Sequence, residues 1–287
     1  MKVLITGAGG QLGKELSRQL KEKDMTVIAL TRNMLNITDQ QAVRHAMRHY
    51  QPDIVVSAAA YTSVDQCETE TEKAYLVNGI GAYYTALEAK RAGADVLHVS
   101  TDYVFDGQAD TPYQVDAQAD PQTIYGKSKK LGEELIQLVS DEVKIIRTSW
   151  LYGHEGHNFV NTILRLAETK DHLRIVNDQI GSPTYTKDAA EALIHLFDQK
   201  AGVYHVSNRE SCSWFDFASE IVMKSGLSAT IETIEPISTE EYGFQTPRPA
   251  YSVLDLQAIE ATGWQPRHWK DALHEYLQKE GRWQQHD

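Results

Sequence analysis

Near its start the chain reads Lys2-Val-Leu-Ile-Thr-Gly7-Ala-Gly-Gly10-Gln-Leu-Gly13-Lys-Glu-Leu16. A short apolar run, a group of glycines and a helical pattern predict a strand, a tight turn and a helix. Gly7, Gly10 and Gly13 follow a GxxGxxG spacing, in which missing side chains let the backbone approach a pyrophosphate. The amino terminus of the helix would offer free N–H groups to that phosphate. A glycine turn that binds nothing is the alternative.

The rest of the first half alternates apolar runs with helical patterns, which predicts a parallel sheet covered on both faces. Asp39 is a suitable cap for the second helix, and Pro52 prevents that helix from running into the next strand. The fold class is therefore α/β, a Rossmann-type doubly wound parallel sheet. We expect strands near 2–6, 26–30, 53–57, 94–99 and 143–148. We expect helices near 10–22, 39–50, 71–92 and 124–139, where apolar residues recur at intervals of three and four.

After Trp150 the pattern loosens. We expect a helix near 158–168, a strand near 172–176, a helix near 185–199 and a strand near 202–207. Residues 1–150 would form the dinucleotide-binding domain, to whose sheet 182–207 returns, and 151–181 with 208–287 would form a smaller substrate-binding cap. The crevice between them would lie at the carboxyl ends of the strands, where a ligand belongs. The polar segment between Asp106 and Thr123 is expected to be a surface loop able to act as a lid.

The composition of the 287 residues excludes several classes of protein. A formal net charge of -12 opposes binding to nucleic acid and attraction to anionic membranes. No apolar stretch approaches the ~20 residues that are needed to span a bilayer. Cys67 and Cys212 lie far apart, which favours a reducing compartment, so we expect a cytoplasmic protein. The histidine pairs at 45/49 and 154/157 are expected to lie on the surface and bind no metal.

A second motif, Tyr125-Gly-Lys-Ser-Lys129, carries groups suited to acid–base chemistry. In a helix, residues four positions apart lie on one face, so the Lys129 ammonium would lie near the Tyr125 phenol. Its positive charge would lower the tyrosine pKa from its usual ~10. Such a phenol can exchange a proton near neutral pH. The same spacing also occurs by chance in surface helices with a snorkelling lysine. Combined with the glycine turn, the motif predicts a hydride-transfer enzyme with a nicotinamide cofactor.

The end of the second predicted strand indicates which nicotinamide cofactor is used. NAD-binding folds usually place an acidic residue there, where it binds the adenosine ribose. Here the chain reads Ala29-Leu-Thr-Arg32-Asn33, without a carboxylate, and Arg32 could pair with a 2′-phosphate. We therefore predict a preference for NADP(H) and leave the use of NAD(H) open. An exposed arginine at a strand end is the alternative.

Several ordered stretches resemble the dTDP-4-dehydrorhamnose reductase family of the extended short-chain dehydrogenase/reductase superfamily. They are Gly10-Gln-Leu-Gly13, Ala58-Ala-Ala-Tyr-Thr-Ser-Val-Asp65, Ser100-Thr-Asp-Tyr-Val-Phe105, Tyr125-Gly-Lys-Ser-Lys129, Arg147-Thr-Ser-Trp150, Asn177-Asp-Gln-Ile-Gly-Ser-Pro-Thr184 and Arg248-Pro249. They span nearly the whole chain in the family's order. The resemblance implies NADPH-dependent reduction of the C4 ketone of dTDP-4-dehydro-L-rhamnose to dTDP-L-rhamnose, the last step of dTDP-rhamnose biosynthesis.

The resemblance also implies roles for individual residues. Thr101 would hold the substrate carbonyl, Tyr125 would give up its proton, and Lys129 would lower the phenol pKa and bind the nicotinamide ribose. Aligned hydroxyls suit this reaction because hydride transfer builds negative charge on the ketone oxygen. The cofactor-binding residues would be Gly7, Gly10, Gln11, Leu12, Gly13, Arg32, Asn36, Ile37, Ala60, Tyr61, Thr62, Tyr125 and Lys129. The substrate-binding residues would be Thr101, Asp102, Tyr103, Trp150 and Arg248, with Arg248 at the diphosphate. For Trp150, packing in the core is the alternative.

Some residues depart from the family's pattern. Ser57 stands where asparagine is common and Asn36 where aspartate is usual, so local cofactor contacts are expected to differ. Some relatives bind magnesium between subunits, and Glu15 matches one such position. A full carboxylate set cannot be placed, so no metal is predicted. A homodimer is left open.

Two other functions remain as alternatives. Related sugar-nucleotide dehydratases and epimerases share the glycine turn and the tyrosine–lysine motif. Dehydratases usually carry an Asp-Glu pair after the threonine, whereas Asp102 is followed here by Tyr103, which favours reduction. A non-catalytic, NADP-binding regulatory subunit, such as that of methionine adenosyltransferase, is the second alternative. The joint presence of Thr101, Tyr125 and Lys129 counts against it.

Overall fold

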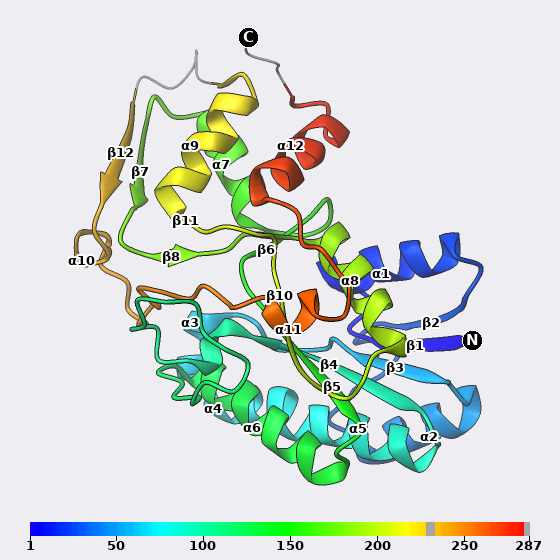
Figure 1. The fold of residues 1–287 in the computed structure, drawn as a ribbon. Helices are drawn as coiled ribbons and strands as arrows, with labels where there is room; N and C mark the ends of the chain where they lie inside the picture. Colours follow the sequence, from blue (N-terminus) through cyan, green and yellow to red (C-terminus); the bar gives the residue numbers. More distant parts are fainter. Residues whose placement is uncertain (228–232, 284–287) are drawn as a thin grey trace.

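A parallel sheet of six strands forms the centre of the molecule, as the computed structural model of residues 1–227 and 233–283 shows. Its order is β10-β5-β4-β3-β1-β2, with every neighbouring pair parallel. The strands are β1 (Lys2–Thr6), β2 (Thr26–Leu30), β3 (Ile54–Ser57), β4 (Asp95–Thr101), β5 (Val143–Thr148) and β10 (Gly202–Val206). Helices cover both faces of the sheet (Figure 1). The predicted fold class, a Rossmann-type α/β sheet, is confirmed.

The two faces of the sheet are buried by alternating side chains of the same strands. On one face, Val3 and Ile5 pack with α1 (Gln11–Glu22) and α8 (Thr186–His195). On the other face, Leu4 packs in a cluster with residues of α2, α5 and α6. These helices are α2 (Gln40–Tyr50), α5 (Ala82–Arg91) and α6 (Ile124–Val139). Asp39 caps α2 as expected, since its carboxylate accepts from the backbone N–H groups of Gln41 and Ala42.

The predicted helix over 71–92 is wrong in detail. The chain forms α3 (Val64–Thr69), α4 (Thr71–Ala74), a π-helix η1 (Tyr75–Gly81) and then α5. A π turn takes more residues than an α turn, so it shifts which side chains face the sheet. The apolar pattern does not reveal such a shift.

A second core lies beside the sheet and is built from the later part of the chain. Three short strand pairs frame it, β7 (His172–Val176) with β12 (Thr233–Ile237), β8 (Ile180–Gly181) with β11 (Cys212–Ser213), and β6 (Leu151–Tyr152) with β9 (Thr184–Tyr185). The helices of this region are α7 (Phe159–Ala167), α9 (Trp214–Lys224) and α12 (Trp269–Lys279), which lie together in Figure 1. The remaining short helices are η2 (Asp102–Val104), η3 (Leu196–Asp198), α10 (Thr239–Tyr242) and α11 (Gln257–Glu260).

The segment between Asp106 and Thr123 is irregular, as expected, but part of it is packed against the protein. The ring of Tyr113 is buried and stacks on Phe105 with centroids 4.3 Å apart. Its backbone also bridges Leu254. These contacts fix the middle of the segment, which limits its use as a lid. Within the described residues, no helix has the length and apolar character needed to cross a membrane.

Candidate active site

A cavity of about 920 Å³ lies at the carboxyl ends of β1, β3, β4 and β5. Strand order reverses at β1, which has β2 on one side and β3 on the other, and open α/β sheets bind their ligands at such a point. All but one of the predicted site residues line this cavity; Arg248 does not. The lining residues are Gly7, Gly10, Gln11, Leu12, Gly13, Arg32, Asn36, Ile37, Ala60, Tyr61, Thr62, Thr101, Asp102, Tyr103, Tyr125, Lys129 and Trp150.

The glycine turn is shaped to hold a phosphate group. Gly7 has φ +71°, and a Cβ there would lie 2.6 Å from the Ala59 backbone, so no other residue fits without movement. Gly10 is the N-cap of α1 and offers no side-chain acceptor to the first turn. The N–H groups of that turn lack intrahelical acceptors and line the cavity, which suits a dinucleotide pyrophosphate.

The end of β2 borders the same cavity. Arg32 is exposed there, two residues beyond the last residue of the strand, and no carboxylate stands at 29–33. Asn36 accepts hydrogen bonds from the backbone and hydroxyl of Thr38. A cationic group with neutral neighbours fits the 2′-phosphate of NADP.

Thr101 and Tyr125 meet at the carboxyl end of β4. The Thr101 hydroxyl is buried, donates to Asp102 Oδ1 at 2.9 Å and accepts from the Tyr103 backbone N–H at 3.3 Å. Tyr125 lies in the first turn of α6 and shares a hydrogen bond with Thr101. Its ring meets the Tyr103 ring edge to face, with centroids 5.4 Å apart. The two hydroxyls therefore lie together in the cavity wall.

The expectation that Lys129 lowers the pKa of Tyr125 is wrong for this structure. Burial raises the pKa of Tyr125, and the hydrogen bond with Thr101 opposes this only in part. The Lys129 ammonium instead donates to the Val99 carbonyl at 2.7 Å and lies 3.2 Å from His98 Nε2. The sequence spacing placed both groups on one helical face, but it could not show these competing partners.

Lys129, which lines the cavity, forms a buried polar pair with His98. Burial lowers the pKa of Lys129 to about 8, although the charge of Glu133 acts in the opposite direction. Burial and the Lys129 charge lower the pKa of His98 well below its usual value. A neutral His98 ring can accept from Lys129 through Nε2 while Nδ1 bonds the Ser57 hydroxyl at 3.2 Å. Ser57, one of the departures from the family pattern, is thus joined to Lys129 through His98.

Three features fix the position of α6, and with it Tyr125. Thr123 caps the helix, since its hydroxyl accepts from the Gly126 N–H at 3.0 Å. Gly126 lies so close to η2 that a Cβ would come 2.1 Å from the Tyr103 carbonyl oxygen. Further along the helix, the buried carboxylate of Glu133 binds Arg147 of β5 through Nε at 3.0 Å and Nη2 at 2.8 Å. The helix is thereby tied to η2, which follows β4, and to the carboxyl end of β5.

The π-helix joins this region to the cofactor side. Asn78 is fully buried and accepts from the Tyr61 N–H at 2.7 Å through its side-chain oxygen. Its amide nitrogen donates to the Tyr61 carbonyl at 3.0 Å and to the Ser128 hydroxyl at 2.9 Å. The Asn78 side chain therefore helps to fix the positions of the 58–62 loop and of the turn of α6 that carries Lys129. Single π turns inside helices are frequent at functional sites.

Asp102 and Tyr103 continue the wall beyond Thr101. Burial raises the pKa of Asp102 to about 6, with hydrogen bonds from Thr101 and Ser252 opposing it. Its Oδ2 atom has no hydrogen-bond partner among the described residues. Burial and the Asp102 charge raise the pKa of Tyr103 to about 12, while Arg248 lowers it. These groups offer hydrogen bonds to a polar ligand.

Arg248 lies outside the cavity wall. Its Nη2 binds both carboxylate oxygens of Asp65, at 2.7 and 2.8 Å, and its guanidinium lies 5.3 Å from the Phe244 ring centroid. The sequence could not show this ion pair, because Asp65 and Arg248 are far apart along the chain. The guanidinium of Arg248 is therefore held by Asp65 and the Phe244 ring.

Known proteins are similar in sequence and in fold to this chain. It matches the family described as the RmlD substrate binding domain over residues 1–282. The chain belongs to this family. It is 64% identical over 278 residues to the spore coat polysaccharide biosynthesis protein SpsK of Bacillus subtilis (strain 168), covering 97% of each chain.

Two further similarities of this RmlD family member concern named reductases. It is 42% identical to the dTDP-4-dehydrorhamnose reductase of Aggregatibacter actinomycetemcomitans, over 95% of this chain and 97% of the relative. A solved structure of dTDP-4-dehydrorhamnose reductase from Bacillus anthracis str. Ames in complex with NADP matches with a TM-score of 0.92 and 38% identity. That match covers 97% of this chain and 99% of the other.

The cavity of the RmlD family member also contains residues that we did not predict. Trp214, Gln179, Ser252 and Pro249 lie in its wall. Gln179 and Pro249 fall within stretches that carry the family resemblance. Trp214 begins α9 after the capping box of Ser213 and Asp216, a pattern that predicts a helix start but no site.

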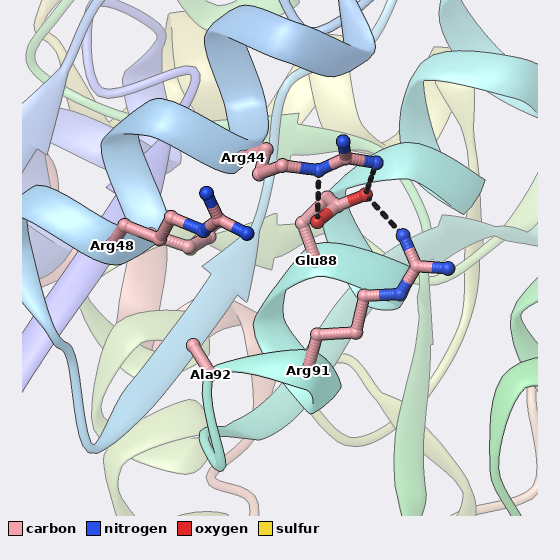
Figure 2. A pocket seen from close by; sticks show the side chains of 6 residues that line it. Arg44, Arg48, Glu88, Arg91 and Ala92 are labelled. Atoms are coloured by element: carbon pink, nitrogen blue, oxygen red, sulfur yellow. Dashed lines mark hydrogen bonds and ion pairs between the residues drawn. The ribbon is translucent and has the colours of Figure 1, made fainter.

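A second hollow in the same molecule has a structural explanation. Figure 2 shows Arg44 and Arg91 converging on Glu88 between α2 and α5. Arg44 Nε lies 3.1 Å and Arg91 Nη1 2.8 Å from the carboxylate. Burial raises the pKa of Glu88, but the hydrogen bonds from Arg44 and Gln40 and the arginine charges outweigh it and lower the pKa. This cluster therefore joins two helices and carries none of the predicted site residues.

Proposed function

We propose that this chain reduces the C4 ketone of dTDP-4-dehydro-L-rhamnose to dTDP-L-rhamnose with NADPH, the last step of dTDP-rhamnose biosynthesis. The observation that carries the proposal is the convergence of Thr101, Tyr125, Lys129 and the glycine turn on one cavity. Membership of the RmlD family and the similarity to named reductases support it.

The chemistry assigns one task to each catalytic group. Bound NADPH supplies the hydride that reaches the ketone carbon. Thr101 would hold the carbonyl oxygen, and Tyr125 would transfer its proton to that oxygen as negative charge develops there. The raised pKa of Tyr125 keeps the phenol protonated, so the proton is present when negative charge develops on the ketone oxygen. Lys129 would bind the nicotinamide ribose.

The remaining roles are assigned by position in the wall. We assign the diphosphate of the cofactor to the turn at Gly7, Gly10, Gln11, Leu12 and Gly13. Arg32 would bind the 2′-phosphate. Asn36 and Ile37 would contact the adenine side of the cofactor, and Ala60, Tyr61 and Thr62 would contact its middle. Asp102, Tyr103 and Trp150 would contact the nucleotide sugar, and Arg248 remains our candidate for its diphosphate.

The organisation of the chain completes the proposal. Residues 1–150 with 182–207 would bind the cofactor, and 151–181 with 208–287 would bind the substrate. The two cysteines are free and buried, which suits the cytoplasm. A homodimer is proposed from the sequence alone, and sedimentation velocity tests it.

The decisive experiment mixes the purified protein with NADPH and dTDP-4-dehydrorhamnose and follows nicotinamide absorbance. We expect turnover in the parent and a loss of roughly 10²–10⁴-fold in Tyr125→Phe, because the variant lacks the proton donor. NADPH binding, measured by fluorescence, should persist in the variant. The exposed Tyr242→Phe provides a matched control that should keep full activity. A parent that binds NADPH but consumes no ketosugar contradicts the proposal and favours the regulatory alternative.

A further inference from the structure

We propose that Trp214 is a positioning residue that holds the Trp150 indole in the cavity wall, so that the pair presents a flat apolar surface to the sugar of the substrate. Both rings line the cavity. The inference rests on the proposed function for the identity of the substrate, and goes beyond it by assigning a role to Trp214 and to Gly181.

The two indoles form a close parallel stack. Their ring centroids lie 3.4 Å apart and their planes differ by 7°. Aromatic pairs usually prefer offset or edge-to-face contacts with centroids about 4.5–7 Å apart. A direct face-to-face sandwich is therefore imposed by what surrounds the rings.

The backbone of Trp150 carries part of this constraint. Its φ is +47°, in the left-handed region that bulky residues rarely adopt. The Trp150 carbonyl accepts from the Thr184 N–H at 3.1 Å, which helps to fix the strained turn. Such backbone conformations gather at functional sites, where the surrounding structure maintains them.

The small β8–β11 pair supplies the other constraints on Trp150. Gly181 of β8 lies against the indole, and a Cβ there would come 2.5 Å from Cε2 and 2.7 Å from Nε1. Gly181 is paired with Cys212 of β11, and that strand leads directly to Trp214. Phe159 packs on the Trp214 ring with centroids 4.4 Å apart. Trp150 thus contacts Gly181 and the Trp214 indole, and the β8–β11 pair joins these two residues.

The position of the stack connects it to the reacting groups. Trp150 follows β5, and Thr148 of that strand is the register partner of Thr101. The stacked wall therefore begins two residues from the strand position beside the catalytic hydroxyl. A deoxysugar has an apolar C–H face and a methyl group, which suit an aromatic surface, while its hydroxyls need the polar groups opposite. A tilt of Trp150 would shift the ketone relative to Thr101 and Tyr125.

The test disturbs Trp150 from two directions. Trp214→Leu removes the supporting ring, and we expect the KM for the nucleotide sugar to rise roughly tenfold while the KM for NADPH stays unchanged. Trp214→Phe keeps a ring in place and should retain most of the affinity. Gly181→Ala pushes on Trp150 while Trp214 is intact, and it should raise the same KM. Calorimetric titration with dTDP-rhamnose gives a readout that is independent of turnover.

A spectroscopic readout follows the stack itself. Stacked indoles give a coupled circular-dichroism signal, which we expect in the parent and not in Trp214→Leu or Trp214→Phe. The matched control is Trp264→Phe, which removes an indole that packs outside the cavity and should leave the coupled signal and the KM unchanged.

The outcomes separate this proposal from the proposed function. Parental affinity for dTDP-rhamnose in folded Trp214→Leu or Gly181→Ala overturns the positioning role and leaves the reductase assignment standing. A parent that binds dTDP-rhamnose but reduces no ketosugar overturns the reductase assignment, and the affinities of the variants still decide the role of Trp214. A parent without affinity for dTDP-rhamnose overturns both. If Trp214→Leu does not fold, Trp214→Phe and Gly181→Ala carry the test.

Discussion

Asp102 shows how a single residue of this site opposes stability. Its carboxyl is buried beside Thr101, and burial raises its pKa from 3.8 to about 6. The folded protein therefore binds more protons than the unfolded chain between these values, so this group lowers stability as pH rises through that window. Above about pH 6 the cost is fully present.

We predict that Asp102→Asn stabilises the protein by up to about 3 kcal/mol near neutral pH and by progressively less as pH falls toward 4. Asparagine keeps the shape and an acceptor for Thr101 but carries no charge. Urea unfolding at about pH 5 and about pH 7.5 measures the difference. An equal gain at both pH values would contradict a raised pKa. We expect the variant to lose affinity for the nucleotide sugar, as buried polar groups at active sites are kept for function.

Arg32 provides a residue-scale prediction about the cofactor. Arg32→Ala should raise the KM for NADPH by roughly 10–100-fold, since it removes a charge-assisted hydrogen bond, and should leave the KM for NADH nearly unchanged. Steady-state rates with both cofactors measure this. Arg48→Ala, on α2 and outside the cavity, is the matched control. An equal loss with both cofactors would show that Arg32 does not read the 2′-phosphate.

At this scale, sequence motifs predicted about half of the residues that line the cavity but few of their contacts with one another. The glycine spacing and Tyr125-Gly-Lys-Ser-Lys129 each lie where expected, because both depend on local order along the chain. The partners of Lys129, the ion pair of Arg248 and the stacking of Trp214 on Trp150 could not be predicted. Each depends on residues that only the tertiary fold brings together.

Among the elements, α6 shows how a helix that carries residues of the cavity wall is anchored to the sheet. Its link to β5 is the ion pair of Glu133 and Arg147, whose side chains are 2% and 6% exposed. Ser100, next to Thr101, donates to the same carboxylate at 2.5 Å. A buried pair of this kind contributes little net stability, but removing one partner leaves the other charged and unpaired.

We predict that Glu133→Gln or Arg147→Met alone costs about 3–5 kcal/mol of unfolding free energy. The double variant should recover much of this loss, because no unpaired charge remains buried. Urea unfolding of the two single variants and the double variant forms the complete cycle. Additive losses in the double variant would show that the two side chains act independently.

Element prediction succeeded where the pattern is purely local. The helix expected over 124–139 agrees with α6, and the expected return of the chain near 202–207 agrees with a strand at β10. The expected helix over 71–92 contains a π-helix, in which the Asn78 side chain bonds Tyr61 and Ser128. The short pairs β6–β9 and β8–β11 were not expected, since two-residue strands carry no periodic signal.

In the whole molecule, the glycine turn is joined to the second core. The side-chain nitrogen of Gln11 donates to the His157 carbonyl at 3.1 Å, and its side-chain oxygen accepts from Asn158 at 3.2 Å. Lys14 of the same helix pairs with Glu155 at 2.6 Å. The 153–158 loop therefore contacts the helix whose first turn lines the cavity.

We predict that NADPH slows amide hydrogen exchange in 153–158 as well as in 7–14. Ligand at 100 times its Kd stabilises the bound form by about 2.7 kcal/mol, which sets the upper limit of the effect. Exchange followed by mass spectrometry measures both segments. Gln11→Ala should reduce the effect in 153–158 more than in 7–14. An unchanged 153–158 segment in the parent would show that the two regions respond separately.

The place of β10 in the sheet has a consequence for how the protein is made. The ribosome completes β5 long before it releases Gly202–Val206, the strand that pairs with β5. During that interval β5 is an open edge of a parallel sheet, with its backbone groups available to other nascent chains. Nascent chains that stall before Gly202 should therefore depend on chaperones and aggregate when these are depleted.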